Sequence, residues 1–176
     1  MTDETRRLHQ GSGGPSWFAI WTRSRHEKIV RDQLSKKSDV DVFLPTIGKW
    51  SRWKDRKKKI DWPLFPGYCF ARFDARDRLL VLKCAGVVGI VSVEGAPAAI
   101  DAREIEGIRR LVESDLAYDP CPFLLEGALV EVTHGPLKGV IGRLIRKSEK
   151  ARLVLSVDLI GQAVSVEVDA ADVRSY

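Results

Sequence analysis

Cysteine and histidine are scarce in this sequence of 176 residues, which contains three of each. The three cysteines are far apart and none has CxxC spacing, so we expect neither a disulfide framework nor a zinc site. The histidines are equally scattered and predict neither a metal cluster nor a catalytic triad. The sequence therefore predicts a protein that is not an enzyme and needs no metal and no cofactor.

Long apolar runs are also missing. No stretch approaches the length needed to cross a bilayer, and the polar N-terminus lacks the apolar centre of a signal peptide. We therefore expect a cytoplasmic protein with no membrane partner. A hydrophobic share of 44% is ample for a folded core. Residues 1–16 are polar, end in a run rich in Gly and Ser, and are predicted to form a flexible tail.

Positive charge is present in excess and is concentrated. Residues 17–115 contain 20 Lys and Arg against 14 Asp and Glu, whereas residues 116–176 contain 7 against 8. The segment from Lys49 to Lys59 alone holds seven basic residues and one acidic residue, Asp55. Such a localised charge indicates a polyanionic partner.

The first hundred residues after the tail alternate between strand and helix patterns. Ser24 and Glu27 have the spacing of a capping box that would begin the first helix. The basic segment interrupts the pattern and is predicted to be an inserted, extended hairpin. The order is βαββαβ plus a helix, which predicts a ferredoxin-like domain with helices on one sheet face. The expected strands are 17–22, 41–47, 68–73 and 87–93, and the expected helices are 25–37, 75–84 and one that begins after Asp101.

The rest of the chain has β patterns only. Prolines in residues 118–122 predict an extended linker, and strands are expected at 129–133, 140–145, 152–159 and 164–168. Short strands of this number close most readily as a five-stranded barrel, which we expect to be permanently folded. The fold class is α+β, and the predicted organisation is a tail (1–16), an N-terminal domain (17–115), a linker (116–124) and a barrel (125–176).

Three segments together resemble the NusG family of transcription elongation and termination/antitermination factors. Leu64 to Phe70 (LFPGYCF) is similar to the signature of that family's N-terminal domain, and Trp17 to Ile20 is similar to its opening strand. Val130 to Gly142 (VEVTHGPLKGVIG) resembles a KOW motif, the turn of a small SH3-like barrel. The resemblance covers nearly everything after the tail.

Alternation along the first and third strands of the N-terminal domain assigns side chains to two faces. Phe18, Ile20 and Phe73 are expected to point towards the helices. The opposite face would be uncovered and aromatic, which suggests a partner surface. The resemblance implies that this partner is the β′ clamp helices of RNA polymerase. The contact residues that it implies are Trp21, Phe65, Pro66, Tyr68 and Phe70, with Ile90 and Val93 at the edge.

Two other roles for these aromatic residues stay open. They could be core residues, or they could stack single-stranded bases as the open sheet of an RNA-recognition module does. The second alternative corresponds to a ribosome-associated or RNA-binding KOW protein.

The resemblance implies that two basic groups contact DNA of the transcription bubble. In the basic segment, tryptophans interleave with the cations and could lie against sugar or base; its candidates are Lys49, Arg52, Lys54, Arg56, Lys57, Lys58 and Lys59. The second group is Arg23, Arg25 and His26, which the resemblance places where specialised members read exposed DNA. A solvated surface is the alternative for both groups.

The barrel has its own candidate site. Gly135, Pro136, Gly139 and Gly142 belong to the KOW motif, and Leu159 and Ile160 occupy the position at which the resemblance implies contact with Rho or a small-subunit ribosomal protein. Ile160 and Leu137 stand where housekeeping members usually have aromatic residues, which favours a specialised, RfaH-like paralogue. The resemblance thus implies a monomeric regulator that binds polymerase, suppresses pausing or termination, and recruits a further factor through its barrel.

Overall fold

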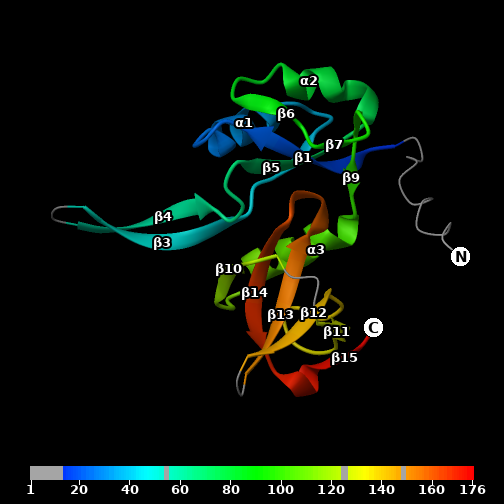
Figure 1. The fold of residues 1–176 in the computed structure, drawn as a ribbon. Coiled ribbons are helices and arrows are strands. Elements are labelled where there is room, and N and C mark those ends of the chain that lie inside the picture. Colours follow the sequence, from blue (N-terminus) through cyan, green and yellow to red (C-terminus); the bar gives the residue numbers. More distant parts are fainter. Residues whose placement is uncertain (1–13, 54–55, 124–126, 148–149) are drawn as a thin grey trace, which may run out of the picture. The chain divides into compact units, whose positions relative to one another are not determined.

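The computed structural model describes residues 14–53, 56–123, 127–147 and 150–176, without the side chains of residues 50–59 and 146–150. Contacts within the chain divide it into two compact units. Figure 1 labels the helices and strands of both. The first consists of residues up to Leu44 together with Pro66–Asp101, and the second of Pro45–Phe65 together with Ala102–Tyr176. The basic hairpin and the third helix therefore belong to the second unit, whereas the predicted domain 17–115 contains both.

An antiparallel sheet forms the centre of the first unit. Its spatial order is β2 (Asp41–Phe43), β5 (Tyr68–Phe73), β1 (Ser16–Thr22) and β6 (Val87–Ile90). This order, with the first and third strands of the motif in the middle, confirms the predicted ferredoxin-like plan. The predicted strand 41–47 is divided, because Pro45 lacks an N–H and cannot continue the ladder.

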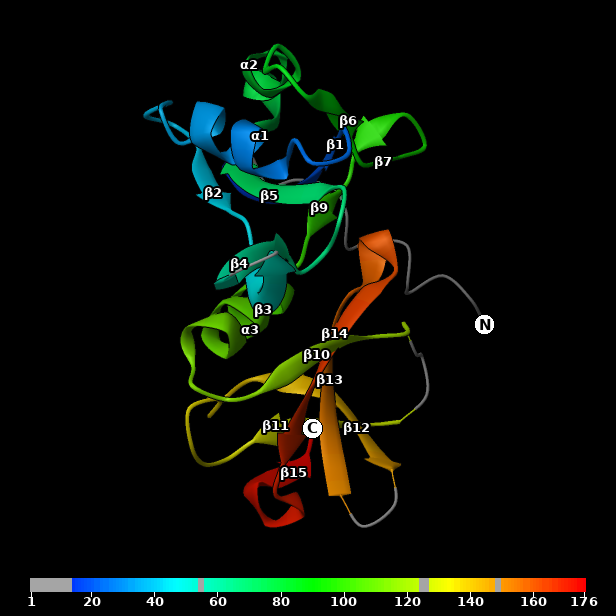
Figure 2. The same cartoon turned by 90° about the vertical axis from the view of Figure 1, so that its left-hand side faces the viewer.

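Two helices cover one face of this sheet, as Figures 1 and 2 both show. They are α1 (Glu27–Leu34) and α2 (Arg78–Leu82), the latter preceded by a 3₁₀ turn at Ala75–Asp77. Alternation correctly predicts the sheet residues beneath them, among them Phe18, Ile20 and Phe73, which form a core with Val30 and Leu34 of α1. Burial in this core raises the pKa of the Cys69 thiol to about 12, so the thiol stays protonated and unreactive.

After β6 the first unit ends in short strands. The predicted strand 87–93 is interrupted at Val91 and becomes two strands, of which the second ends where Glu94 and Gly95 turn the chain with positive φ. The turn joins β7 (Ser92–Val93) to β8 (Ala96–Pro97), and β9 (Ala99–Ile100) then pairs with β1.

The second unit contains the predicted hairpin, formed by β3 (Thr46–Trp53) and β4 (Arg56–Pro63). Its register runs from Thr46 opposite Pro63 to Trp53 opposite Arg56, without a bulge.

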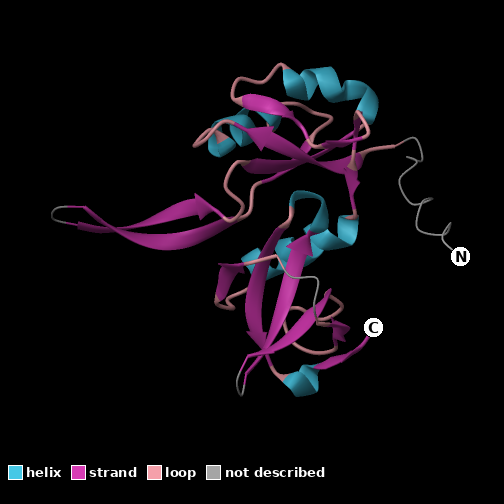
Figure 3. Ribbon diagram, in the orientation of Figure 1, coloured by secondary structure: helices cyan, strands magenta, loops and turns pink. Residues whose placement is uncertain are grey.

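The predicted barrel is confirmed, with one additional strand. Figure 3 shows the strands that dominate this unit. The added strand is β10, which pairs with β14 from Tyr118 to Cys121 in residues predicted as a linker. Pro120 is tolerated there because β10 is an edge strand. The spatial order is β10 (Tyr118–Cys121), β14 (Gln162–Val168), β13 (Lys150–Val157), β12 (Ile141–Lys147), β11 (Ala128–Val132) and β15 (Val173–Ser175).

The third helix, α3 (Ala102–Glu113), packs on this barrel. The approach is close at Gly107, where an added Cβ would lie 3.2 Å from Val140 and 3.8 Å from Leu155. The Arg110 guanidinium donates a 2.7 Å hydrogen bond to the Lys138 carbonyl. The close approach at Gly107 and the Arg110–Lys138 hydrogen bond explain why α3 belongs to the same unit as the barrel.

None of the helices in the described parts of the chain is long and apolar enough to span a membrane.

Candidate functional site

Trp21 is the most exposed aromatic residue of the first unit and lies on the sheet face opposite α1 and α2. Its neighbours across the strands are Tyr68 on β5 and Gly89 on β6. Gly89 has no side chain, and even an added Cβ would meet nothing within 4 Å, so this side of the indole is open. Trp21 is 53% exposed. A large apolar side chain held in the open by a sheet is a feature of partner surfaces.

Two other aromatic residues predicted for this surface are not on it. Phe65 is 1% exposed and Phe70 is 0% exposed, so the prediction that they form an exposed contact is wrong. Alternation indicates which face a side chain takes, but it does not indicate whether that face is covered. The Phe70 ring packs beside Phe43, with ring centroids 6.3 Å apart. Both buried residues are therefore core residues, the alternative that the sequence left open.

The edge of the predicted surface also changes. Ile90 pairs with Ile20 and packs against the core beneath the helices, so its predicted place at the edge of the aromatic face is wrong. Val93 is exposed on β7, and Pro66 is exposed in the turn before β5. The apolar residues that remain accessible are Trp21, Pro66 and Val93, with Tyr68 half-buried.

The Gly67 peptide joins this surface to the start of α1. Its N–H donates a 2.8 Å hydrogen bond to Glu27 Oε1, and its carbonyl accepts one of 2.8 Å from the Thr22 N–H. Glu27 is 5% exposed. The predicted capping box is wrong, because α1 begins at Glu27 and the side chain of its N-cap, His26, makes no capping bond. The sequence did not reveal the role of Glu27, because the local match to a capping box accounts for the same residue.

We expect Glu27→Ala to lower the free energy of unfolding by about 1 to 3 kcal/mol, because it leaves the Gly67 N–H without its acceptor. Glu27→Gln keeps an acceptor oxygen and is expected to lose less. Urea unfolding, with hydrogen exchange of the Gly67 amide, measures both effects. Wild-type stability and wild-type exchange in Glu27→Ala would contradict the assigned role.

The three residues predicted to read DNA come together in the loop between β1 and α1. Arg23 and Arg25 are exposed, and Arg25 has a φ of +64°, a strained conformation for a residue with a side chain. His26 is half-buried; its Nδ1 lies 2.9 Å from the Ser24 carbonyl oxygen. Its ring is next to Gly86, where an added Cβ would lie 2.9 Å from the His26 Cβ. The loop thus presents two exposed cations on a fixed backbone.

The basic hairpin is described mainly through its backbone. Lys49 is exposed. Lys54 lies outside the described residues, as do the side chains of Arg52, Arg56, Lys57, Lys58 and Lys59. The backbone register sets Arg52 directly opposite Lys57.

The KOW-like turn uses its glycines for two different purposes. Gly135 and Gly139 have φ of +79° and +83°, which the turn requires. Gly142 instead lies against β13, where an added Cβ would be 2.8 Å from the Val154 carbonyl oxygen. Pro136, which lies between Gly135 and Gly139 in the turn, is exposed. Leu159 and Ile160 are half-buried in a 3₁₀ turn, Asp158–Ile160, on a different connection of the barrel.

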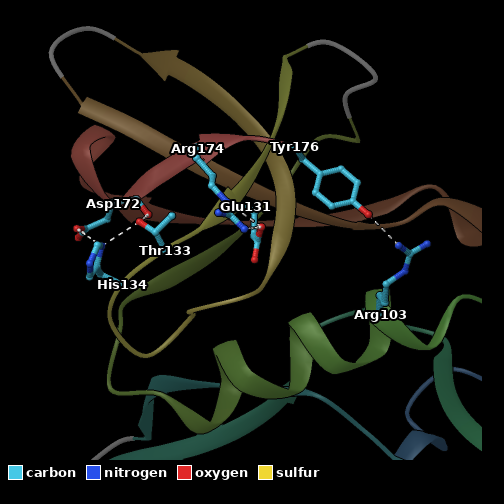
Figure 4. Close-up of polar contacts among 7 residues, drawn as sticks. All are labelled: Arg103, Glu131, Thr133, His134, Asp172, Arg174 and Tyr176. Atoms are coloured by element: carbon cyan, nitrogen blue, oxygen red, sulfur yellow. Dashed lines mark hydrogen bonds and ion pairs between the residues drawn. The ribbon is translucent and has the colours of Figure 1, made fainter.

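Polar contacts near the KOW-like turn connect the C-terminal residues to residues 131–134 and to α3 (Figure 4). The Thr133 hydroxyl donates a 2.9 Å bond to the Asp172 carbonyl, and Arg174 forms a 2.7 Å ion pair with Glu131. Arg103 of α3 donates to the Tyr176 hydroxyl at 3.3 Å. Exposed pairs of this kind contribute little stability. Among the described residues, no group of three or more His, Cys, Asp or Glu side chains could hold a metal ion.

The fold and these surfaces define a class of two-part protein, in which a ferredoxin-like sheet is combined with a small barrel. Residues 15–109 match the family described as "Transcription termination factor nusG". The chain belongs to the NusG family of transcription termination/antitermination factors.

Relatives agree with this assignment, and a solved structure shows the same fold. The chain is 30% identical over 169 residues to the transcription termination/antitermination protein NusG of Rickettsia bellii, covering 90% of this chain and 88% of that protein. It is 30% identical over 173 residues to the protein of the same name from Yersinia pestis, with 90% and 94% covered. A structure concerned with domain interaction in Thermotoga maritima NusG has the same fold, with a TM-score of 0.56 at 23% identity and 94% and 99% covered.

Proposed function

We propose that this protein docks on the β′ clamp helices of bacterial RNA polymerase through Trp21, Tyr68, Pro66 and Val93. The observation that carries the proposal is the exposed Trp21 indole, held beside Tyr68 and left open by Gly89. Membership of a transcription-factor family supports a partner in the transcription machinery. Docking there would suppress pausing or termination, by a monomer acting in the cytoplasm without a cofactor.

The contact that we propose is smaller than the sequence suggests, because Phe65 and Phe70 are buried and do not contribute to it. Their burial also argues against an open sheet that stacks RNA bases, since such a sheet needs several exposed aromatic rings. Titration of the full-length protein against core RNA polymerase, and separately against single-stranded RNA, tests the proposal. Binding to RNA without binding to polymerase would replace it with the RNA-binding alternative.

The barrel would recruit a further factor, Rho or a small-subunit ribosomal protein, through Leu159 and Ile160. Their partial exposure on a turn supports this role. The departures from the housekeeping pattern at Leu137 and Ile160 support a specialised paralogue, and the burial of Leu137 gives that position a structural use as well.

The basic hairpin and the loop of Arg23, Arg25 and His26 would contact DNA of the transcription bubble. For the hairpin we expect Lys57→Gln, Lys58→Gln and Lys59→Gln together to weaken binding to a bubble-containing duplex. For every phosphate that the variant no longer neutralises, the slope of log K against log salt should become shallower by about 0.9. Fluorescence anisotropy at several salt concentrations measures both quantities.

A matched variant with the same change of charge controls for nonspecific electrostatics. Lys36, Lys37 and Lys83 lie in the first unit, away from the hairpin sequence, and their replacement by Gln should leave the slope nearly unchanged. Equal effects of the two triple variants would make the hairpin an ordinary solvated surface.

A further inference from the structure

One hydrogen bond ties the base of the basic hairpin to the barrel. The Tyr118 hydroxyl donates to the Thr46 carbonyl at 2.8 Å. Thr46 is the first residue of β3, and Tyr118 is the first residue of β10. The bond therefore joins a strand of the hairpin to the edge strand of the barrel sheet, within the second unit.

The backbone of the hairpin leaves this carbonyl available. The Leu64 N–H donates to the Pro45 carbonyl at 2.8 Å, so Pro45 and Leu64 face each other as a hydrogen-bonded pair. In an antiparallel ladder, bonded and non-bonded pairs alternate, and the carbonyl of the next residue, Thr46, is directed away from β4. A polar group of the backbone in such a position needs a donor from elsewhere. Tyr118 supplies it.

Tyr118 is well placed to act as a fixed donor. Its backbone is paired with Val166 of β14, and its side chain is half-buried. Burial, and then the negative charge of Asp61, raise the pKa of the Tyr118 phenol above its ordinary value of 10. The hydroxyl hydrogen is therefore present throughout the neutral pH range.

The length of the basic hairpin gives the hydrogen bond at its base a large effect on the position of its far end. Each strand has eight residues, which at about 3.3 Å each gives a hairpin about 26 Å long. An isolated two-stranded ribbon is at best marginally stable. A swing of about 20° at the base would move the far end by about 9 Å, comparable to the width of about 12 Å of a DNA major groove.

We propose that Tyr118 is a positioning residue that fixes the direction of the basic hairpin relative to the barrel, so that its cations meet nucleic acid in one orientation. This inference rests on the proposed contact between the hairpin and DNA. Tyr118 itself touches the hairpin backbone and need not touch the nucleic acid.

Tyr118→Phe tests the inference, because it removes the hydroxyl and keeps the ring in β10. We expect affinity for a fluorescein-labelled bubble duplex to fall about five- to tenfold, while the salt slope stays unchanged because every cation remains. Residual dipolar couplings of the full-length protein provide the second readout. In the wild type, amides of β3 and β4 should share one alignment tensor with those of the barrel; in Tyr118→Phe they should not.

Tyr176→Phe is the matched control, since it removes another tyrosine hydroxyl of the same unit, one that interacts with Arg103. It should change neither affinity nor alignment. A shared tensor and unchanged affinity in Tyr118→Phe would overturn the positioning role. The triple lysine variant separates this failure from failure of the proposed function: if it binds the duplex like wild type, the hairpin is not a DNA contact at all.

Discussion

Trp21→Ala in the full-length protein is expected to weaken binding to core RNA polymerase by about 30-fold, with little change in stability. An exposed aromatic anchor at the centre of an interface contributes about 2 kcal/mol or more, and each 1.4 kcal/mol is a factor of ten in affinity. Half of the Trp21 surface is already exposed to solvent, so its truncation leaves no buried cavity. Equilibrium binding to fluorescently labelled polymerase, with thermal unfolding of each variant, measures both quantities.

Two comparisons define this prediction. Leu79→Ala removes an equally exposed apolar side chain from α2, beyond the opposite face of the sheet, and should leave polymerase binding unchanged. Phe70→Ala should behave in the reverse way: it empties a core position and is expected to lower the free energy of unfolding by about 3 to 5 kcal/mol. If a folded Trp21→Ala variant bound polymerase with wild-type affinity, Trp21 would not be the central residue of the contact and the proposal would be contradicted.

Gly142→Val is expected to prevent the barrel from folding. Even a Cβ at this position would lie 2.8 Å from both the Val154 carbonyl oxygen and a methyl carbon of Leu155. The first of these atoms belongs to the backbone, which cannot move aside without breaking the pairing of β12 with β13. Overpacking commonly costs about 1 to 3 kcal/mol, and a valine against backbone should exceed this. Loss of the barrel's amide signals in NMR spectra, while those of the first unit persist, is the expected result.

Gly135→Ala provides the contrast within the same motif. An added Cβ there meets nothing within 4 Å, and only the positive φ opposes it. We expect a cost of about 1 to 2 kcal/mol and a folded barrel. If both glycine variants lost the same stability, the close approach at Gly142 would not be the reason for that glycine.

Short-range patterns in the sequence predicted most of the fold. Alternation separated Phe18 and Ile20 from Trp21, and the β-branched residues after position 128 predicted the barrel. These signals succeed because they report the local backbone period, which the final fold preserves. The order of strands and helices then left few topologies to choose from.

Features that depend on distant contacts were missed. Glu27 pairs with Gly67, forty residues away, and not with its own helix start. Phe70 is on the predicted face but is covered, and Tyr118 joins a sheet although prolines follow it. In each case the deciding partner lies far along the chain, and no local pattern carries information about it.

Strand β10 also sets the length of the free connection between the end of α3 and the sheet. While β10 is paired, only residues 114–117 connect Glu113 to the sheet, and a fully extended chain of that length reaches about 18 Å. If β10 separated from β14, the connection would extend to Ala128 and reach about 50 Å. The four residue pairs between β10 and β14, from Tyr118 with Val166 to Cys121 with Ala163, thus determine whether the connection after α3 is short or long.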